Sequence, residues 1–200
     1  LVSSGYTEGF YYKPRIDKEL LAAHSKGLIG LSSCLKGEVA SEIRSEQSRK
    51  AMAAAATYRD ILGDGNFFLE MQFQGLDEQR LVNTGLLPIA RDLNMPLVCT
   101  NDVHYLRQDD HKPHDILLCI GTGKTVNDAD RLKYHGDQFY LKTGDEMARV
   151  FSDFPDAIAR SGQIAARCHV DLSFKENYLP NFEVPDGFTL EDRKSTRLNS

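Results

Sequence analysis

Short apolar runs recur along the first half of the chain, and longer amphipathic segments separate them. The runs have the length of β-strands and are bounded by turn residues, at residues 28–33, 67–73 and 96–100. The segments between them, residues 45–62 and 77–94, carry apolar residues at near-helical spacing. Strands that alternate with helices of this length predict an α/β fold with a parallel sheet or barrel. In such folds, ligand sites lie at the carboxyl ends of the strands.

Turn and capping residues mark several helix ends. Gly5 stands where a C-cap would end a helix in which the chain begins. Pro88 lies inside the helical segment of residues 77–94 and is expected to kink or split it, because proline lacks a backbone donor. Asp109 or Asp110 is expected to cap a further helix.

Three signals describe the C-terminal part of the chain. Residues 143–146 have the Ser/Thr-x-x-Glu form of a capping box. Pro155 suits the first turn of another helix. Residues 177–187 hold two prolines and no helical period, which predicts an extended linker.

Composition narrows the classes of function. The 200 residues are 41% apolar and 26% charged, as expected of one soluble domain, or of one domain and the start of another. No stretch reaches the ~20 apolar residues that cross a bilayer and no signal peptide opens the chain, so a cytoplasmic protein without a membrane partner is expected. The net charge of −5 argues against a basic nucleic-acid-binding surface, but acidic and His clusters bind metals that supply positive charge themselves.

Asp102 and His104 follow the third apolar run directly. In extended backbone, side chains two residues apart project to the same face, so these two are expected to meet at the carboxyl end of a buried strand. A carboxylate and an imidazole held in this way form half of a divalent metal site. The alternative is a hydrogen-bonded surface pair, and spacing alone does not separate the two.

Cys34 stands at the equivalent place after the first apolar run. A lone cysteine after an apolar run is more often a small core residue than a thiolate ligand, and the second candidate site at an equivalent strand end makes the ligand interpretation more credible. The four cysteines are far apart and form no Cys-x-x-Cys pair, so neither a disulfide framework nor a zinc finger is expected. Glu70, in the second run, is expected to support a metal site or to form an interior ion pair, and is not counted as a ligand.

Two further motifs have simpler explanations. Residues 120–125 resemble the end of a P-loop, but Leu118 stands where the motif needs glycine, and a predicted helix rather than a strand precedes it. His111 and His114 have the i, i+3 spacing of a metal pair, but the surface of a helix start accounts for them.

Four short sequence blocks are shared with one family of replicative polymerases. They occur in the same order as in that family, and at similar spacings. They are Gly-Phe-Tyr-Tyr-Lys-Pro-Arg-Ile-Asp at residues 9–17, Leu-Ser-Ser-Cys-Leu-Lys-Gly-Glu at 31–38, Thr-Asn-Asp-Val-His-Tyr at 100–105 and Tyr-Leu-Pro-Asn-Phe at 178–182. Through them the chain resembles the PHP domain of the alpha subunit of bacterial DNA polymerase III, over nearly its whole length, to about Asp192.

The resemblance implies a fold, a cofactor and partners. The fold is a distorted (β/α) barrel. The domain carries divalent metal ions (zinc, manganese or magnesium), and in many members of the family it removes mispaired 3′ nucleotides. Three of the family's ligand positions match Cys34, Asp102 and His104, which makes the chain similar to the branch that retains its metals. The implied mechanism is metal-assisted phosphodiester hydrolysis, with these residues as ligands and not as acids or bases. DNA and other replicative holoenzyme subunits are the implied partners.

The resemblance also implies parts that lie beyond this sequence. The family's His-x-His motif lies upstream of residue 1, and the polymerase's catalytic aspartates lie far downstream. We therefore interpret the chain as an interior segment, with most of a PHP domain at residues 1–170, a linker toward the polymerase palm at 171–192 and a foreign tail at 193–200. The tail is expected to pack against nothing, and the isolated chain is expected to be inactive as a polymerase and as a nuclease.

Two rival functions stand beside this interpretation. A free-standing PHP phosphoesterase would act on a small phosphate ester, and a structural scaffold would brace the polymerase without chemistry. The main interpretation makes a geometric prediction: Cys34 and the Asp102/His104 pair, 68 residues apart, meet on one rim of the sheet, with residues 67–73 between or beside them.

Overall fold

The computed structural model describes residues 1–174, 187 and 189, in a chain that divides into two compact units of residues 1–167 and residues 168–200. All helices and strands of the described residues belong to the first unit. In chain order they are α1 (Val2–Thr7), α2 (Lys18–Ala23), β1 (Gly30–Leu31), α3 (Glu38–Arg44), α4 (Ser48–Leu62), β2 (Phe67–Met71), α5 (Asp77–Asp92), β3 (Leu97–Cys99), the 3₁₀-helix η1 (Gln108–Asp110), α6 (His111–Thr122), α7 (Gly144–Val150) and α8 (Pro155–Arg167).

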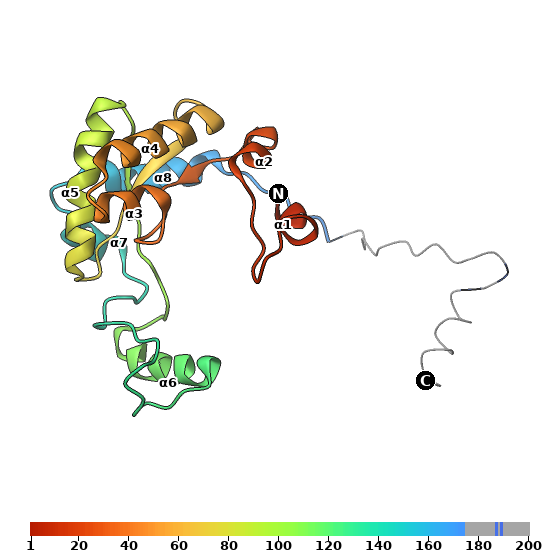
Figure 1. The fold of residues 1–200 in the computed structure, drawn as a ribbon. Coiled ribbons are helices and arrows are strands. Elements are labelled where there is room, and N and C mark those ends of the chain that lie inside the picture. Colours follow the sequence, from red (N-terminus) through yellow and green to blue (C-terminus); the bar gives the residue numbers. More distant parts are fainter. Residues whose placement is uncertain (175–186, 188, 190–200) are drawn as a thin grey trace. The chain divides into compact units, whose positions relative to one another are not determined.

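A parallel sheet of three strands organises the first unit, with α3, α4 and α5 grouped around it (Figure 1). The middle strand is β2, which pairs with β1 through Phe67 opposite Gly30 and with β3 through Leu69 opposite Leu97. The predicted α/β fold with parallel strands is therefore confirmed, with strands shorter than the apolar runs. The described residues form an open sheet, so the expected barrel is not closed among them.

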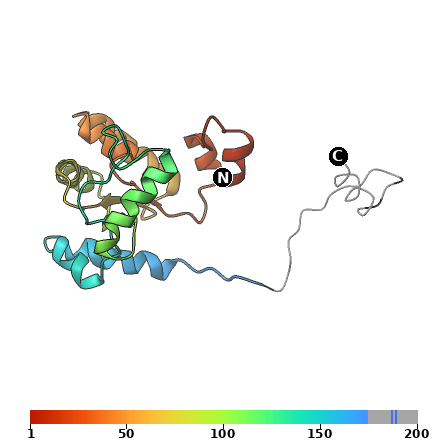
Figure 2. The ribbon, with the colours of Figure 1, turned by 90° about the horizontal axis from the view of Figure 1, so that it is seen from below.

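The middle strand is apolar on both faces, which is typical of parallel sheets that helices cover. Phe67, Phe68, Leu69 and Met71 of β2 are all buried. Figure 2 shows the strands between helices when the fold is turned by 90°. The edge strand β3 packs along α8, which brings the last helix of the unit onto the sheet.

Small residues let the helices approach one another closely. Ala51, Ala54 and Ala55 form the buried face of α4, which packs against α3 and α5. Gly85 has the same effect where α5 meets α3, because a Cβ at this position would lie 2.5 Å from Cγ2 of Ile43. The helical layer depends on these small side chains, since a larger group would force neighbouring helices apart.

Two helices differ from the sequence prediction. The sequence predicts one helix from residue 45, and the structure begins this helix, α4, only at Ser48. A further helix, α3, precedes it and was not predicted from the periodicity. Glu46 has left-handed backbone (φ 58°) and interrupts the helical conformation between them. Pro88 does not split α5, which is one helix, because Leu86 and Ile89 on either side of Pro88 are both buried in the core.

Gly5 is not the C-cap that the sequence suggests. It lies inside α1, whose C-cap is Glu8, and it is buried. A Cβ at Gly5 would lie 3.4 Å from the carbonyl oxygen of Arg15, an ordinary van der Waals contact, so neither capping nor lack of space accounts for the glycine.

The region around α6 begins and ends with caps. Asp110 accepts a hydrogen bond from the backbone N–H of Arg107 (2.9 Å), which caps η1 directly before α6. The helix continues to Thr122, and Gly123 ends it in the left-handed conformation (φ 64°). Residues 120–125 are therefore a helix C-terminus and not a phosphate-binding loop.

The capping box at the start of α7 forms as predicted. Thr143 Oγ1 accepts from the backbone N–H of Glu146 (3.3 Å), and the Glu146 carboxylate accepts from the backbone N–H of Thr143 (2.8 Å). The Tyr140 hydroxyl also donates to this carboxylate (2.7 Å). Hydrogen bonds from Thr143 and Tyr140 lower the pKa of Glu146 from 4.5 to about 2. Pro155 begins α8, which confirms the predicted first turn of that helix.

We expect Glu146→Gln to lower the melting temperature near neutral pH and to have little effect in acid. Because the folded pKa lies below the usual value of 4.5, the carboxylate stabilises the fold at higher pH, and this contribution is lost as the pH falls toward about 2. Thermal unfolding of both proteins by circular dichroism across this range measures the difference. A difference in Tm that stays constant on acidification would contradict the assignment.

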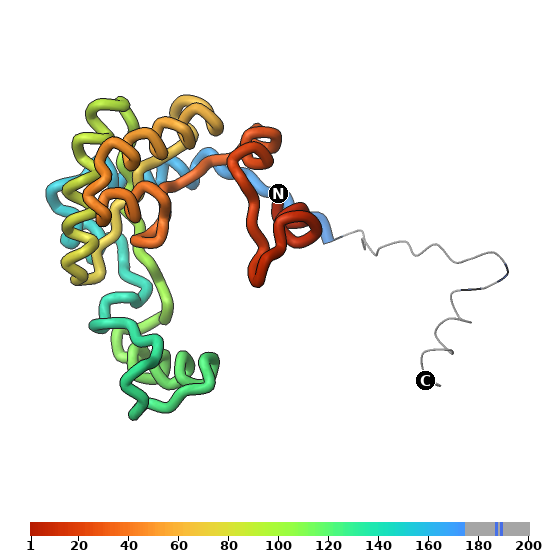
Figure 3. Tube along the Cα trace, in the orientation of Figure 1, coloured from red at the N-terminus to blue at the C-terminus, as the bar shows by residue number. Residues whose placement is uncertain are grey.

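Within the described residues, no helix is long and apolar enough to cross a membrane. The predicted linker at residues 177–187, apart from Gly187, and the predicted tail at 193–200 lie outside the described residues. Figure 3 traces the chain within the first unit, where α6 and the loop after it lie to one side of the helices that pack on the sheet.

Candidate functional site

Glu70 connects the carboxyl ends of the three strands. Its Oε2 accepts from the backbone N–H of Ser33 after β1 (3.0 Å), and its Oε1 accepts from the hydroxyl of Thr100 after β3. Gln72 Nε2 also donates to Glu70 Oε1 (3.1 Å), and the Glu70 backbone N–H donates to Ser32 Oγ (2.8 Å). Within the described residues Glu70 forms no ion pair, so it holds the strand ends together through neutral partners.

Cys34 follows β1 in a tight turn. Ser33 has left-handed backbone (φ 69°), and the backbone N–H of Gly37 donates to the carbonyl of Cys34 (2.8 Å). A Cβ at Gly37 would lie 2.2 Å from the carbonyl oxygen of Ser32, so the turn needs glycine. The Cys34 side chain is half-buried, whereas burial raises the pKa of the Cys99 thiol to about 12. Cys34 therefore lies at the edge of the sheet and not in the core.

Asp102 and His104 meet after β3, as the sequence predicts, but by a different route. The backbone N–H of Val103 donates to the carbonyl of Asn101 (2.8 Å), which makes a γ-turn centred on Asp102. His104 Nδ1 lies 2.9 Å from the carbonyl oxygen of Asp102 and 3.8 Å from its Oδ1. A turn, and not the alternation of an extended strand, brings the two residues together.

His104 is enclosed by aromatic side chains from α6 and the loop after it. Its Nε2 lies 2.7 Å from the Tyr134 hydroxyl, and the two ring centroids are 4.3 Å apart. Phe139 meets the imidazole edge to face at 5.6 Å, and its carbonyl accepts from the His104 backbone N–H (2.8 Å). The ring of His114 lies 5.8 Å away. These contacts fix the imidazole in one orientation.

The surroundings of the Tyr134 phenol raise its pKa. Burial raises this pKa, and the charges of Asp102 and Cys34 raise it further. The middle position of β2 is confirmed. A short separation between the Cys34 sulfur and His104 stays a prediction.

The donor chemistry suits a divalent metal, but the arrangement is only part of a ligand set. Thiolate, carboxylate and imidazole are established ligand types for zinc, and the last two also for manganese. Among the described residues, no three His, Cys, Asp or Glu side chains are grouped so as to hold a metal ion. Both ring nitrogens of His104 also have partners, at the Asp102 carbonyl and the Tyr134 hydroxyl.

Known proteins match both the N-terminal part and nearly the whole of the chain. A family model described as the PHP domain matches residues 1–74. The DNA polymerase III subunit alpha of Treponema pallidum is 44% identical over 192 residues, which is 96% of this chain. The subunits of Borreliella burgdorferi (37% identical) and Mycobacterium tuberculosis strain CDC 1551 (43% identical) match over 94% and 86% of it. The chain spans 15–16% of the length of these curated relatives.

This chain is homologous to the N-terminal PHP region of DNA polymerase III alpha subunits. The match to the PHP domain includes Cys34 and Glu70. The alignment with the T. pallidum subunit covers 96% of the chain, and so includes Asp102 and His104. The family to which the four sequence blocks point is therefore confirmed.

The sequence pattern missed the contribution of Tyr134 and Phe139 to the surroundings of His104. Neither residue belongs to a periodic segment or a recognisable motif, so no local signal could have found them. His111 and His114 lie in the first turn of α6, at a helix start as expected. The ring of His114 nevertheless packs 5.3 Å from that of Tyr105, and burial together with His104 lowers its pKa.

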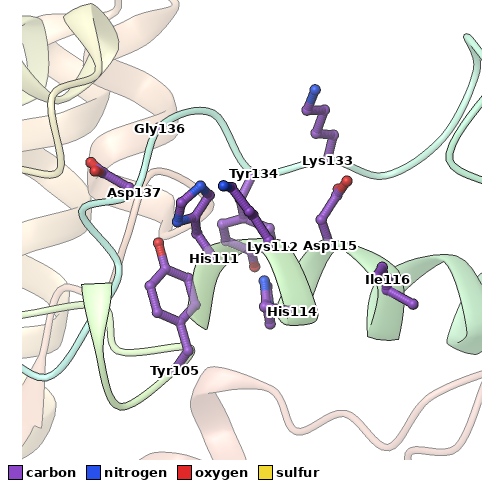
Figure 4. A pocket seen from close by; sticks show the side chains of 10 residues that line it. All are labelled: Tyr105, His111, Lys112, His114, Asp115, Ile116, Lys133, Tyr134, Gly136 and Asp137. Carbon is purple, nitrogen blue, oxygen red and sulfur yellow. The ribbon is translucent and has the colours of Figure 1, made fainter. Parts of the chain in front are cut away.

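Tyr134 also lines a cavity of about 600 Å³ between α6 and the loop of residues 133–137 (Figure 4). Arg131 forms a two-point ion pair with Asp115 of α6, which fastens the start of this loop to the helix. The lining residues are Tyr105, His111, Lys112, His114, Asp115, Ile116, Lys133, Tyr134, Gly136 and Asp137.

Proposed function

We propose that this chain is the part of a DNA-directed DNA polymerase that binds divalent metal ions and hydrolyses phosphodiesters at the 3′ end of DNA. Its ligands are Cys34, Asp102 and His104, and the metals are zinc, manganese or magnesium. The observation that carries the proposal is the grouping of Asp102 and His104 after β3, where His104 Nδ1 lies 3.8 Å from Asp102 Oδ1 and Nε2 lies 2.7 Å from the Tyr134 hydroxyl. The homology to DNA polymerase III alpha subunits supports the polymerase context.

The surrounding residues orient the proposed ligands. Glu70 holds the turn after β1 and the turn after β3 at a fixed distance through its bonds to Ser33 and Thr100. The Asp102 carbonyl and the Tyr134 hydroxyl set the plane of the His104 ring. A complete site needs more ligands than these three, and the resemblance assigns them to positions upstream of residue 1. Bound metals would supply an activated water and stabilise the leaving oxygen.

The proposal extends to the whole polymerase. Residues 1–170 would form most of a distorted (β/α) barrel of PHP type, which residues of the parent protein complete. Residues 171–192 would lead toward the palm, and residues 193–200 would not be native. The parent protein would work in the cytoplasm on DNA, together with other subunits of the replicative holoenzyme.

The test uses the full-length parent polymerase. We expect Cys34→Ala, Asp102→Asn and His104→Ala each to lower the bound metal and to slow digestion of a mispaired 3′ end by about 10–100-fold. Metal content is measured by mass spectrometry, and digestion is measured with Mn²⁺ or Zn²⁺. Extension of a paired primer is expected to continue, because none of the three residues is proposed to act in polymerisation. The isolated chain is expected to do neither reaction efficiently.

Cys168→Ala is the matched control for Cys34→Ala, because Cys168 is exposed. Metal content that is unchanged in all three ligand variants would disprove the proposed ligand set. Fast digestion by the isolated chain, abolished by Cys34→Ala, would show that these three residues suffice and that no further ligands are needed.

A structural scaffold without chemistry is the second candidate. The observation in its favour is that the described residues contain no three-residue metal group and that both nitrogens of His104 are engaged. A full-length protein that purifies without metal, and whose melting temperature a chelator does not change, would favour the scaffold over the metal site.

A further inference from the structure

Tyr134 occupies the position on His104 that a metal ion would need. A carbonyl oxygen can only accept, so His104 Nδ1, which lies 2.9 Å from the Asp102 carbonyl, carries a proton. The other nitrogen, Nε2, lies 2.7 Å from the Tyr134 hydroxyl. In a neutral imidazole this hydroxyl donates to the Nε2 lone pair, and in an imidazolium no lone pair remains. In both cases Nε2 has no free lone pair for a metal.

The contact between Tyr134 and His104 is held by packing as well as by the hydrogen bond. Besides its 4.3 Å approach to the imidazole, the Tyr134 ring meets Phe139 edge to face at 4.9 Å and His114 at 5.3 Å. The phenol is half-buried. Four rings therefore form one cluster, and the tyrosine is seated in it rather than lying loosely on the surface.

Tyr134 also has room to leave this position. It belongs to the irregular segment between α6 and α7 and lines the cavity of about 600 Å³ (Figure 4). Gly136, two residues later, has positive φ (83°), a conformation in which glycine is unstrained. The ion pair of Arg131 with Asp115 holds the start of the loop on α6. A movement of the tyrosine is therefore confined to the few residues after that anchor.

We propose that Tyr134 is a displaceable latch on His104, which closes on Nε2 and swings into the neighbouring cavity when a divalent metal binds. This inference rests on the proposed role of His104 as a metal ligand. The phenol keeps its proton throughout. The Nε2 lone pair of His104 exchanges the Tyr134 hydroxyl for the metal ion. Tyr134 thus lowers the affinity of the site for metal, because binding has to break the Tyr134–His104 hydrogen bond.

The test is Tyr134→Phe in the full-length protein, with Mn²⁺ binding followed by electron paramagnetic resonance. The phenylalanine keeps the ring packing and removes the hydroxyl, so we expect the Kd for Mn²⁺ to fall by about 3–10-fold. Tyr58→Phe is the matched control, because the Tyr58 hydroxyl donates to Glu38 Oε2 (2.8 Å) on other elements. Its Kd is expected to equal that of the wild-type protein.

A second readout needs no metal. Diethyl pyrocarbonate acylates imidazole nitrogens with a free lone pair, so in metal-free protein Tyr134→Phe should speed modification of His104, mapped by peptide mass spectrometry. The exposed His24 should react equally in both proteins. Unchanged reactivity of His104, or weaker Mn²⁺ binding in Tyr134→Phe, would overturn the latch. If Mn²⁺ binding depends on Asp102 but not on the Tyr134 hydroxyl, only the latch fails, whereas wild-type protein that binds no Mn²⁺ refutes the proposed function as well.

Discussion

Leu86→Ala is expected to lower the free energy of unfolding by about 2–5 kcal/mol, because it leaves a cavity in a close-packed core. Leu86 is 1% exposed, on the face of α5 that packs against α3, α4 and β2. Leu81→Ala on the same helix is the matched control, since Leu81 is 51% exposed. It should change the free energy of unfolding by about 0.5 kcal/mol or less.

Urea unfolding followed by circular dichroism measures both variants. The two leucines are five positions apart, which is about 140° around an α-helix, so they face different sides of α5. Similar losses in the experiment would mean that α5 is rotated about its axis relative to the structure. A large loss for Leu86→Ala alone supports the observed packing of the helix.

Glu70→Ala is expected to destabilise the fold by about 1–3 kcal/mol, because it removes one acceptor from several donors at once. The backbone N–H of Ser33, the Thr100 hydroxyl and Gln72 Nε2 would all lose their shared partner. Glu70→Gln should lose less, since an amide oxygen can still accept from one of them.

Amide hydrogen exchange locates the effect of Glu70. In Glu70→Ala the Ser33 amide should exchange faster, whereas the Leu69 amide, which bonds to the carbonyl of Pro96 (3.0 Å), should stay protected. Unaltered exchange at Ser33 would show that Glu70 does not hold the turn after β1. Uniformly faster exchange across the sheet would instead indicate global destabilisation.

The sequence was sufficient to predict the elements whose signals are local. Three apolar runs with helices between them predicted the parallel strands, because strand length and turn residues are properties of neighbouring positions. The box at Thr143 and Glu146 was predicted for the same reason. The pairing of Asp102 with His104 was also predicted, since residues two apart in sequence stay close in either an extended chain or a turn.

Other features depend on contacts between distant segments, and no local pattern records them. The γ-turn at Asp102 forms where the chain leaves the sheet. The residue types at this place suit an extended strand equally well. The break at Glu46 between α3 and α4 is a single left-handed residue in an otherwise helical stretch. Positions 81 and 86 are both leucine, and only the packing of α5 decides which of the two is buried.

The amino-acid sequence by itself determined the family, the parallel α/β fold and three candidate ligands at the strand ends. Only the tertiary structure decided that Glu70 connects those ends and that Tyr134 reaches His104 from 30 positions away. The reason is physical: hydrophobic periodicity is repeated along a segment and can be read from it. A hydrogen bond between two loops depends on one side chain from each, and forms only after the sheet and α6 have brought the loops together.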